Sequence, residues 1–310
     1  MVNPDLQRIE QLLLQQGYIG EANITMSVFL SMQLQKPLLI EGPAGVGKTE
    51  IAKVMARALN TRLIRLQCYE GLDATHAIYE WNYQRQLLFL KTQELGTKDE
   101  GRRTKVEGRG AGSSDELEET LFSEKYLMKR PLLEAITQTQ SPVLLIDEID
   151  RADEEFESFL LEILSDWQIT IPEIGTITAK AIPYIVVTGN RTREISEALR
   201  RRCLYLYIDY PTFEKELSIV RNKVPNIDTH LGEQICRFME LLRQQKLDKI
   251  PGIAETLDWA KALAALHIDH LDKNIVEQTL GVILKDWQDI RHTQLSLTEL
   301  WEKTGMINKM

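Results

Sequence analysis

The chain has 310 residues, of which 43% are hydrophobic, so it is long enough for one large domain or two modest ones with a packed core. Its net charge of −9 argues against broad binding to nucleic acid, which needs many basic groups to release counterions from phosphates. No apolar run approaches the roughly 18 residues of a membrane helix, and three cysteines without metal-ligand spacing favour a reducing compartment, so we expect a cytoplasmic protein without a membrane span.

Short apolar runs alternate with helical patterns along the first two thirds of the chain. Residues 5–16, 22–35 and 48–60 have the apolar periodicity of helices. The runs that are typical of buried strands are 36–42, 61–68, 142–150, 182–190 and 203–211. Because this alternation indicates a parallel sheet with helices on both faces, we predict an α/β domain over residues 1–210.

Two segments interrupt the alternation. Residues 91–119 are charged, contain Gly and Ser and hold almost no apolar side chains, which predicts a mobile tract that buries too little surface to order itself. Residues 168–180 alternate around Glu173-Ile174-Gly175, a pattern that predicts a β-hairpin.

From about Pro211 onward the pattern is wholly helical. The candidate helices are 212–223, 229–246, 254–267 and 274–290, and the stretch KIPGIAE at 249–255 separates the second from the third. The sequence therefore predicts a second, all-α domain over residues 211–310.

The stretch GPAGVGKT matches the phosphate-binding pattern GxxxxGK[ST] and lies between a predicted strand and a predicted helix, where that pattern belongs. Glycines in such a loop let backbone N–H groups approach phosphate oxygens, and the helix that follows adds unpaired N–H donors. Lys48 would reach the β- and γ-phosphates of ATP, while the Thr49 hydroxyl would ligate Mg²⁺. The residues expected to bind the nucleotide are Gly42, Pro43, Ala44, Gly45, Val46, Gly47, Lys48 and Thr49.

An acidic pair follows the apolar run VLLI. Asp147 and Glu148 stand at the carboxyl end of that predicted strand, where doubly wound sheets bind ligands. Asp147 would hold Mg²⁺ through water, and Glu148 would orient and polarise the attacking water. Asn190 ends the next strand along the chain and suits a sensor of bound triphosphate, although Asn before a turn is also ordinary turn chemistry. Asp150 and Asp153 are expected to cap a helix or to face solvent.

These motifs, followed by an arginine cluster and a helical C-terminal part, make the chain resemble the AAA+ ATPases over nearly its whole length. Within that group the chain is similar to the MoxR family, and particularly to its CoxD-like branch. The stretches that carry the resemblance are EGPAGVGKTEIAK (41–53), CYEGLDATHAIYEWNYQRQLL (68–88), LLIDEIDRADEEFESFLLEILSD (144–166), ALRRRCLYLYIDYP (198–211) and PGIAETLDWAKAL (251–263). The second and the last are the more specific.

The resemblance implies a five-stranded parallel sheet in the order 5-1-4-3-2, followed by a helical lid. It also implies an insertion at about 84–120 and a β-hairpin at 168–180. In assembled rings of this family, such insertions and hairpins line the pore or the top face and contact the client protein. The alternatives here are a loop and a hairpin without such a role. The resemblance further places Tyr18 and Ile19 beside the adenine, and core packing between two helices is the alternative for them.

One departure from the family concerns the lid. Many relatives carry an arginine early in the lid helix that reaches the γ-phosphate within the same subunit. Here residues 254–256 are Ala, Glu and Thr, and Lys261 lies too far along the helix to replace the arginine. We therefore expect hydrolysis to be slow or to be stimulated by a partner.

Arg200, Arg201 and Arg202 stand just before the last predicted strand. In the AAA+ superfamily this position faces the nucleotide of the neighbouring subunit, where a guanidinium neutralises charge on the γ-phosphoryl group in transfer. The resemblance aligns Arg202 with this arginine finger, leaves Arg201 as the runner-up, and makes Arg200 a solvated or ion-paired residue. The residues expected to act in catalysis are Glu148, Lys48, Asn190 and Arg202.

We therefore expect a Mg²⁺-dependent ATPase that works as a ring, expected to be a hexamer. The resemblance implies a chaperone that remodels or matures a protein complex such as a metal-cofactor enzyme, with a partner that carries a von Willebrand factor A domain. Two alternatives stay open, a nucleic-acid motor or loader and a nucleotide-switched scaffold that hardly turns ATP over. Residues 91–110 contain six Lys or Arg and four carboxylates, a mixture that disfavours nucleic acid.

Overall fold

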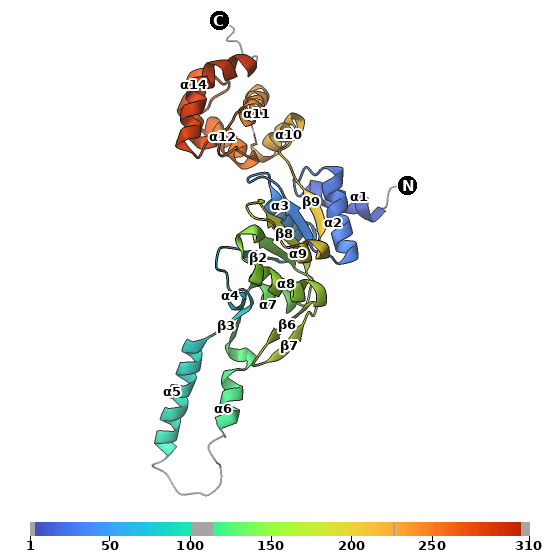
Figure 1. Cartoon of the computed structure of the whole chain (residues 1–310), viewed down its shortest axis with the longest axis vertical. Helices are drawn as coiled ribbons and strands as arrows, with labels where there is room; N and C mark the ends of the chain where they lie inside the picture. Colours follow the sequence, from blue (N-terminus) through green and yellow to red (C-terminus); the bar gives the residue numbers. More distant parts are fainter. Residues whose placement is uncertain (1–3, 101–113, 226, 305–310) are drawn as a thin grey trace.

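A five-stranded parallel sheet forms the centre of the computed structural model, which describes residues 4–100, 114–225 and 227–304 (Figure 1). Its strands are β1 (Leu38–Glu41), β2 (Leu63–Gln67), β5 (Val143–Asp147), β8 (Tyr184–Gly189) and β9 (Leu204–Tyr207). Their order across the sheet is β2-β5-β8-β1-β9, and every neighbouring pair is parallel. When these five strands are numbered 1 to 5 along the chain and read from β9 to β2, the order is 5-1-4-3-2. The fold expected from the AAA+ resemblance is therefore confirmed.

Helices cover both faces of the sheet because its central strands β1, β5 and β8 are buried on both sides. In β1, Leu38 and Ile40 pack with side chains of α2 (Ala22–Leu34) and α3 (Lys48–Ala58), and α1 (Pro4–Gln15) packs outside these two helices. Leu39, which points the other way, joins the cluster beneath the helices of the opposite face. Those helices are α7 (Pro131–Ile136), α8 (Glu154–Asp166) and α9 (Glu197–Arg202).

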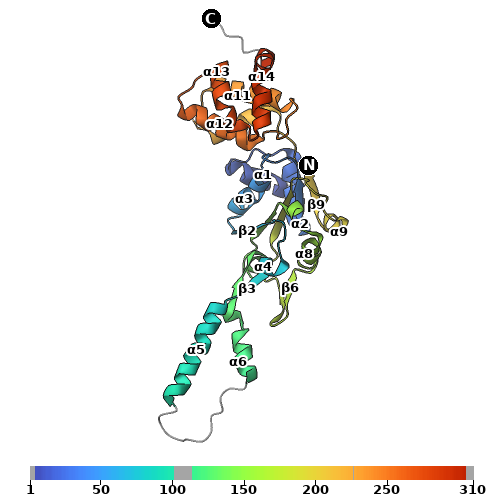
Figure 2. The ribbon, with the colours of Figure 1, turned by 60° about the vertical axis from the view of Figure 1, so that its left-hand side comes forward.

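An arm of two helices projects from the core, at the end away from the C-terminal helices (Figures 1 and 2). It consists of α5 (Tyr83–Glu100) and α6 (Ser114–Leu121). The arm stands on an antiparallel pair of strands, β3 (Tyr79–Trp81) and β4 (Leu127–Lys129). The short α4 (Ala74–Ile78) precedes β3, and a 3₁₀ turn (Glu124–Tyr126) precedes β4.

The arm corrects one prediction. Residues 91–100 and 114–119 are helical, so the expectation of a tract without order is wrong for them, and 101–113 lie outside the described residues. The helix α5 contains the apolar run 87–90 near its start and continues into the polar residues 91–100, because extending a helix costs far less than nucleating it. At its base, Gln86 Nε2 donates to the carbonyl oxygen of Leu121 (2.6 Å) and ties the two helices together.

Residues 168–178 form a β-hairpin, as predicted. The strand β6 (Gln168–Ile171) pairs antiparallel with β7 (Gly175–Thr178). Ile169 and Ile171 are buried, which fixes the register because a slip by one residue would expose them.

The helices that follow the sheet form what we call the helical region, residues 213–304. They are α10 (Phe213–Lys223), α11 (Thr229–Arg243), α12 (Ile253–Ala265), α13 (Lys273–Ile283) and α14 (Trp287–Thr304). Their buried side chains form a cluster of their own around Phe238 and Trp259. This separate cluster supports a domain boundary near residue 210, which stays a prediction. Within the described residues, no helix is both long and apolar enough to cross a lipid bilayer.

The predicted helix over 274–290 is wrong as a single element, because α13 ends at Ile283 and α14 begins at Trp287. Asp286 explains the break. Its carboxylate accepts a hydrogen bond from the backbone N–H of Gln288 (2.8 Å), so it acts as the side-chain cap of a new helix.

Candidate functional site

A cavity of about 460 Å³ lies where the phosphate loop, the carboxyl ends of β5 and β8 and the helical region meet. Its volume suits a ligand of nucleotide size. The predicted ATP-site residues among its lining are Tyr18, Ile19, Ala44, Gly45, Val46, Gly47, Lys48, Thr49, Asp147, Glu148 and Asn190. The predicted residues Gly42, Pro43 and Arg202 do not belong to the described lining.

The phosphate loop joins β1 to α3 through unusual backbone conformations. Gly42, Gly45 and Gly47 have positive φ angles of 155°, 76° and 94°. Gly42 also has no room for a side chain, because a Cβ there would lie 1.9 Å from the carbonyl oxygen of Ile208. This contact ties the start of the loop to the residue that follows β9.

Lys48 is buried, and its side chain folds back over the loop. Its Nζ donates hydrogen bonds to the carbonyl oxygens of Gly42 (2.8 Å) and Pro43 (2.6 Å). Burial lowers the pKa of this ammonium group, and the nearby carboxylates of Asp150 and Asp147 oppose that shift. Because burial disfavours the charged form, a phosphate at this position would supply the anionic partner that stabilises it.

Asp147, the last residue of β5, is buried, and neighbouring side chains hold both of its carboxylate oxygens. Its Oδ1 accepts hydrogen bonds from the hydroxyls of Thr49 (3.1 Å) and Thr188, and its Oδ2 accepts one from Arg65 of β2 (2.6 Å). Mg²⁺ prefers hydroxyl, carboxylate and water oxygens, so the donor set of Thr49 and Asp147 fits the ion that the fold family implies.

Glu148 lines the cavity in a constrained conformation. Its φ angle of 57° is left-handed, a region that residues other than glycine rarely adopt and that is concentrated at functional sites. Its backbone N–H donates to the Thr188 hydroxyl (3.1 Å), and its Oε2 accepts a hydrogen bond from Arg151 (3.0 Å). The carboxylate is thus held at the cavity wall, where it is suited to orient a water molecule.

Asp150 corrects the expectation that it caps a helix or faces solvent. It is buried, and its Oδ2 accepts hydrogen bonds from the backbone N–H groups of Asn190 (3.0 Å) and Thr192 (2.8 Å) and from the Thr192 hydroxyl (2.6 Å). Parallel pairing of β5 with β8 brings the turn after β8 onto this carboxylate, so Asp150 fixes Asn190 at the cavity. Asp153, in contrast, caps α8 as predicted by accepting from Phe156 N (2.8 Å).

Tyr18 and Ile19 lie between α1 and α2 and line the cavity together with Ile208, Pro211 and Leu257. These side chains give the cavity an apolar wall that suits a base. Tyr18 also packs against the buried cluster of the sheet, and burial raises the pKa of its phenol, so that the group stays neutral. Both predicted roles of Tyr18, contact with adenine and packing between helices, therefore fit its position.

Arg200 points inward from α9. Its Nη2 lies 3.2 Å from both carboxylate oxygens of Glu41, the buried last residue of β1, and the Tyr205 hydroxyl donates to the same carboxylate (2.9 Å). Of the two predicted roles for Arg200, ion pairing is therefore the one observed. Since Glu41 directly precedes Gly42, the pair anchors the start of the phosphate loop.

Neither Arg201 nor Arg202 belongs to the described lining of the cavity in their own chain. Arg201 is 76% exposed and pairs with Glu197 on the surface of α9. Arg202 donates to the hydroxyl of Ser165 (2.6 Å) and to the carbonyl oxygen of Ala198 (3.1 Å). Among the described residues that line the cavity, the side-chain cations are lysines.

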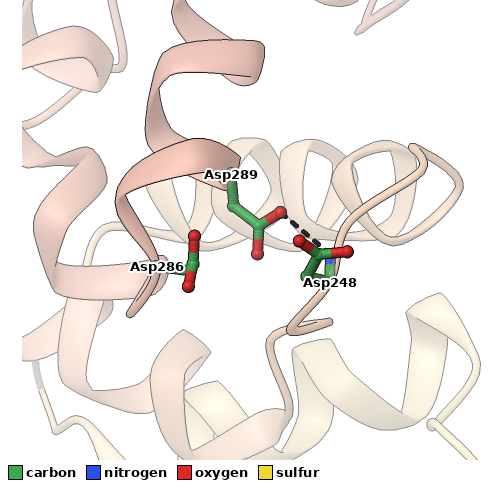
Figure 3. A group of neighbouring side chains, drawn as sticks. All are labelled: Asp248, Asp286 and Asp289. Atoms are coloured by element: carbon green, nitrogen blue, oxygen red, sulfur yellow. Dashed lines mark hydrogen bonds between the residues drawn. The ribbon is translucent and has the colours of Figure 1, made fainter.

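The carboxylates of Asp248, Asp286 and Asp289 lie close together in the helical region (Figure 3). None of the three belongs to the described lining of the cavity. The buried Asp289 accepts hydrogen bonds from the backbone N–H groups of Asp248 and Lys249, both at 2.9 Å. Asp286 caps α14 and lies 3.8 Å from Lys249 Nζ. These carboxylates hold the segment between α11 and α12 in place, and we assign them a structural role.

Sequence patterns did not identify Arg65 or Thr188 as parts of the site. Thr188 gave a faint signal, because it is a polar residue near the end of an apolar run and two positions before Asn190. Arg65 gave none, since only the order of the sheet places β2 beside β5 and thereby brings its guanidinium to Asp147.

Comparison with known proteins gives a family for the segment that holds the phosphate loop, Asp147, Glu148 and Asn190. The model of the AAA domain, dynein-related subfamily, matches residues 37–203, which is just over half of the chain. Two staphylococcal relatives are uncharacterized proteins. The one from Staphylococcus haemolyticus is 25% identical over 255 residues, 78% of this chain and 84% of the relative. The one from Staphylococcus epidermidis is 26% identical over 218 residues, 68% of this chain and 70% of the relative.

Among solved structures, the chain is similar to the RuvB Holliday junction branch migration motor of Thermotoga maritima. The identity is 19% and the TM-score 0.47, over 92% of this chain and 78% of that one. A mutant of the same protein gives 18% identity and a TM-score of 0.48 over the same shares.

Proposed function

The chain belongs to the dynein-related subfamily of AAA domains, and from this premise we propose that it is a Mg²⁺-dependent ATPase that remodels a protein complex. The observation that carries the proposal is the cavity on which the phosphate loop, Asp147 and Glu148 converge. A loop built for phosphates beside two carboxylates at the ends of parallel strands suits hydrolysis of a nucleotide triphosphate better than binding of an uncharged ligand.

In the proposed mechanism each group has one task. The N–H groups of the loop and the Lys48 ammonium bind the phosphates, and Thr49 and Asp147 would hold Mg²⁺, which would supply positive charge to the phosphates of ATP. Glu148 orients the attacking water and takes its proton, and Asn190, fixed through its backbone by Asp150, contacts the γ-phosphate side of the site.

We further propose that the protein acts as a ring, expected to be a hexamer. Transfer of a γ-phosphoryl group is accelerated by a guanidinium that stabilises the charge of the transition state. Arg201 and Arg202 lie outside the cavity of their own chain, so neither supplies this group there. A neighbouring subunit would supply that group, with Arg202 as the first candidate and Arg201 as the second.

For the client we propose a protein complex in the cytoplasm, in particular a metal-cofactor enzyme matured together with a partner that carries a von Willebrand factor A domain. The arm supports a protein client, because α5 presents the exposed apolar side chains Tyr83, Leu87 and Leu88 on a projecting helix. The free thiols of Cys68, Cys203 and Cys236 are in keeping with a reducing compartment.

Two substitutions test the ATPase proposal. We expect Lys48→Ala to abolish nucleotide binding, and Glu148→Gln to keep binding while turnover falls about 100-fold or more, as for loss of a general base. Binding is measured with a fluorescent ATP analogue and turnover by phosphate release. Unchanged turnover in Glu148→Gln would remove Glu148 from the mechanism.

The same assay separates the alternatives. Strong stimulation of turnover by single-stranded or duplex DNA would favour a nucleic-acid motor over a chaperone. Tight ATP binding without turnover, in the assembled wild-type protein, would favour the nucleotide-switched scaffold.

A further inference from the structure

The helical region contacts the phosphate loop directly through the backbone. The N–H groups of Ile253 and Ala254, the first residues of α12, donate to the carbonyl oxygen of Gly45 at 2.9 and 3.3 Å. The first N–H groups of a helix have no partner within the helix and usually bind a capping side chain or water. Here a carbonyl group of the phosphate loop takes that place.

The contact is close enough to require a glycine. A Cβ on Gly252 would lie 2.7 Å from the Cα and the carbonyl carbon of Gly45 and 2.8 Å from the carbonyl oxygen of Ala44. The φ angle of Gly252 is −92°, which any residue adopts, so the neighbouring loop and not the backbone conformation demands a glycine here. The N–H of Gly252 donates to Glu255 (2.8 Å), which fixes the start of α12.

A buried polar network holds Gly252 from behind. Arg243 of α11 makes two hydrogen bonds of 2.6 Å to Glu216 of α10 and donates to the carbonyl oxygen of Pro251 (2.9 Å). The Thr256 hydroxyl donates to Glu216 (2.6 Å) and lies 3.2 Å from the carbonyl oxygen of Gly252. This network of charged and hydroxyl groups ties α10, α11 and the start of α12 together.

We propose that Gly252 is a positioning residue for the phosphate loop, and that α12 couples the helical region to bound nucleotide through the carbonyl group of Gly45. In a planar trans peptide the C=O and the following N–H point in opposite directions, so holding this carbonyl fixes the direction of the Val46 N–H, a donor of the phosphate loop. Fixing a donor before binding removes part of the entropy cost of binding. The inference rests on the proposed nucleotide site.

The coupling must be reciprocal, because a contact that strengthens nucleotide binding is itself strengthened by nucleotide. This gives the helical region a way to respond to nucleotide without the arginine that many members of the family it resembles carry early in the corresponding helix. The contact from residue 254 comes from its backbone N–H and therefore does not depend on the side chain at this position.

The test is Gly252→Ala, with Gly281→Ala as the matched control. A Cβ on Gly281, in α13 of the same helical region, meets nothing within 4 Å, so the control adds the same methyl group without a clash. We expect Gly252→Ala to weaken binding of a fluorescent ATP analogue about fivefold or more, the lower end of a typical coupling. Binding by Gly281→Ala should stay within about twofold of the wild type, since a methyl group without a clash leaves the contact intact.

A second readout distinguishes positioning from general damage to the fold. We expect the KM for ATP to rise more than kcat falls in Gly252→Ala. Thermal unfolding of this variant, followed by far-UV CD, should show a single transition as in the wild type. Wild-type affinity in folded Gly252→Ala overturns the proposal. A wild-type protein that binds no nucleotide contradicts the proposed function instead, so the two failures are distinguishable.

Hydrogen exchange in the wild-type protein tests the same point even where Gly252→Ala does not fold. The amides of Ile253 and Ala254 should exchange more slowly when nucleotide is added, because the coupling is reciprocal. Equal exchange with and without bound nucleotide overturns the proposal.

Discussion

At the scale of single residues, Arg65 bears on metal binding, because its guanidinium lies 2.6 Å from the carboxylate of Asp147. A positive charge at this distance opposes the approach of Mg²⁺. Arg65 is 51% exposed, so solvent screens much of its charge and the effect is modest. We expect Arg65→Gln to lower the Mg²⁺ concentration needed for half-maximal nucleotide binding about two- to fivefold, which corresponds to an exposed ion pair of roughly 0.5–1 kcal/mol.

The control for Arg65→Gln is Arg62→Gln, which removes an equally charged side chain just before β2. Arg62 pairs with Glu134 on the surface, so its loss should leave the Mg²⁺ requirement unchanged. The measurement is a Mg²⁺ titration of nucleotide binding at fixed ionic strength. A higher Mg²⁺ requirement in Arg65→Gln would contradict the expectation and would mean that Arg65 orients Asp147 for the metal.

At the scale of elements, the short helix α9 gives its three arginines different environments. Arg200→Ala should destabilise the protein by about 1–3 kcal/mol, because it leaves the buried Glu41 carboxylate with the Tyr205 hydroxyl but without its charged partner. Thermal unfolding measures this effect. Arg201→Ala is the control, since its exposed pair with Glu197 should contribute little. Equal stability of the two variants would refute the anchoring role of Arg200.

At the scale of the whole molecule, the proposed ring would make turnover depend on an arginine that α9 of a neighbouring subunit supplies. We expect Arg202→Ala to bind ATP normally and to lose turnover, because the proposed guanidinium serves the nucleotide of another subunit. Mixing Arg202→Ala with Lys48→Ala should restore part of the activity, since some interfaces then combine an intact cavity with an intact arginine. The measurement is phosphate release at several mixing ratios.

Size-exclusion chromatography of the mixture provides the control for assembly. If mixed rings form and turnover stays absent, Arg202 does not act between subunits. Repeating the mixture with Arg201→Ala decides between the two candidate arginines.

Much of the fold followed from local patterns in the sequence. The apolar runs predicted the strands of the sheet, and the glycines around Lys48 predicted the phosphate loop. Both patterns consist of residues that are neighbours in the chain. The strand order 5-1-4-3-2 came from the resemblance to a family and not from periodicity. The helical arm and the break before Trp287 were missed, since helix propagation in α5 and a single capping Asp286 outweighed composition and apolar periodicity.

By itself, the sequence determined the chemistry available to this protein: a phosphate loop, an acidic strand end and a run of three arginines before the last strand. Only the tertiary structure decided which of these groups meet. It brought Arg65 to Asp147, Asp150 to the backbone of Asn190, and Gly252 to the phosphate loop. Each of these contacts joins residues far apart in the chain, and the direction of a side chain across a sheet or between two layers is set by packing, which no local pattern records.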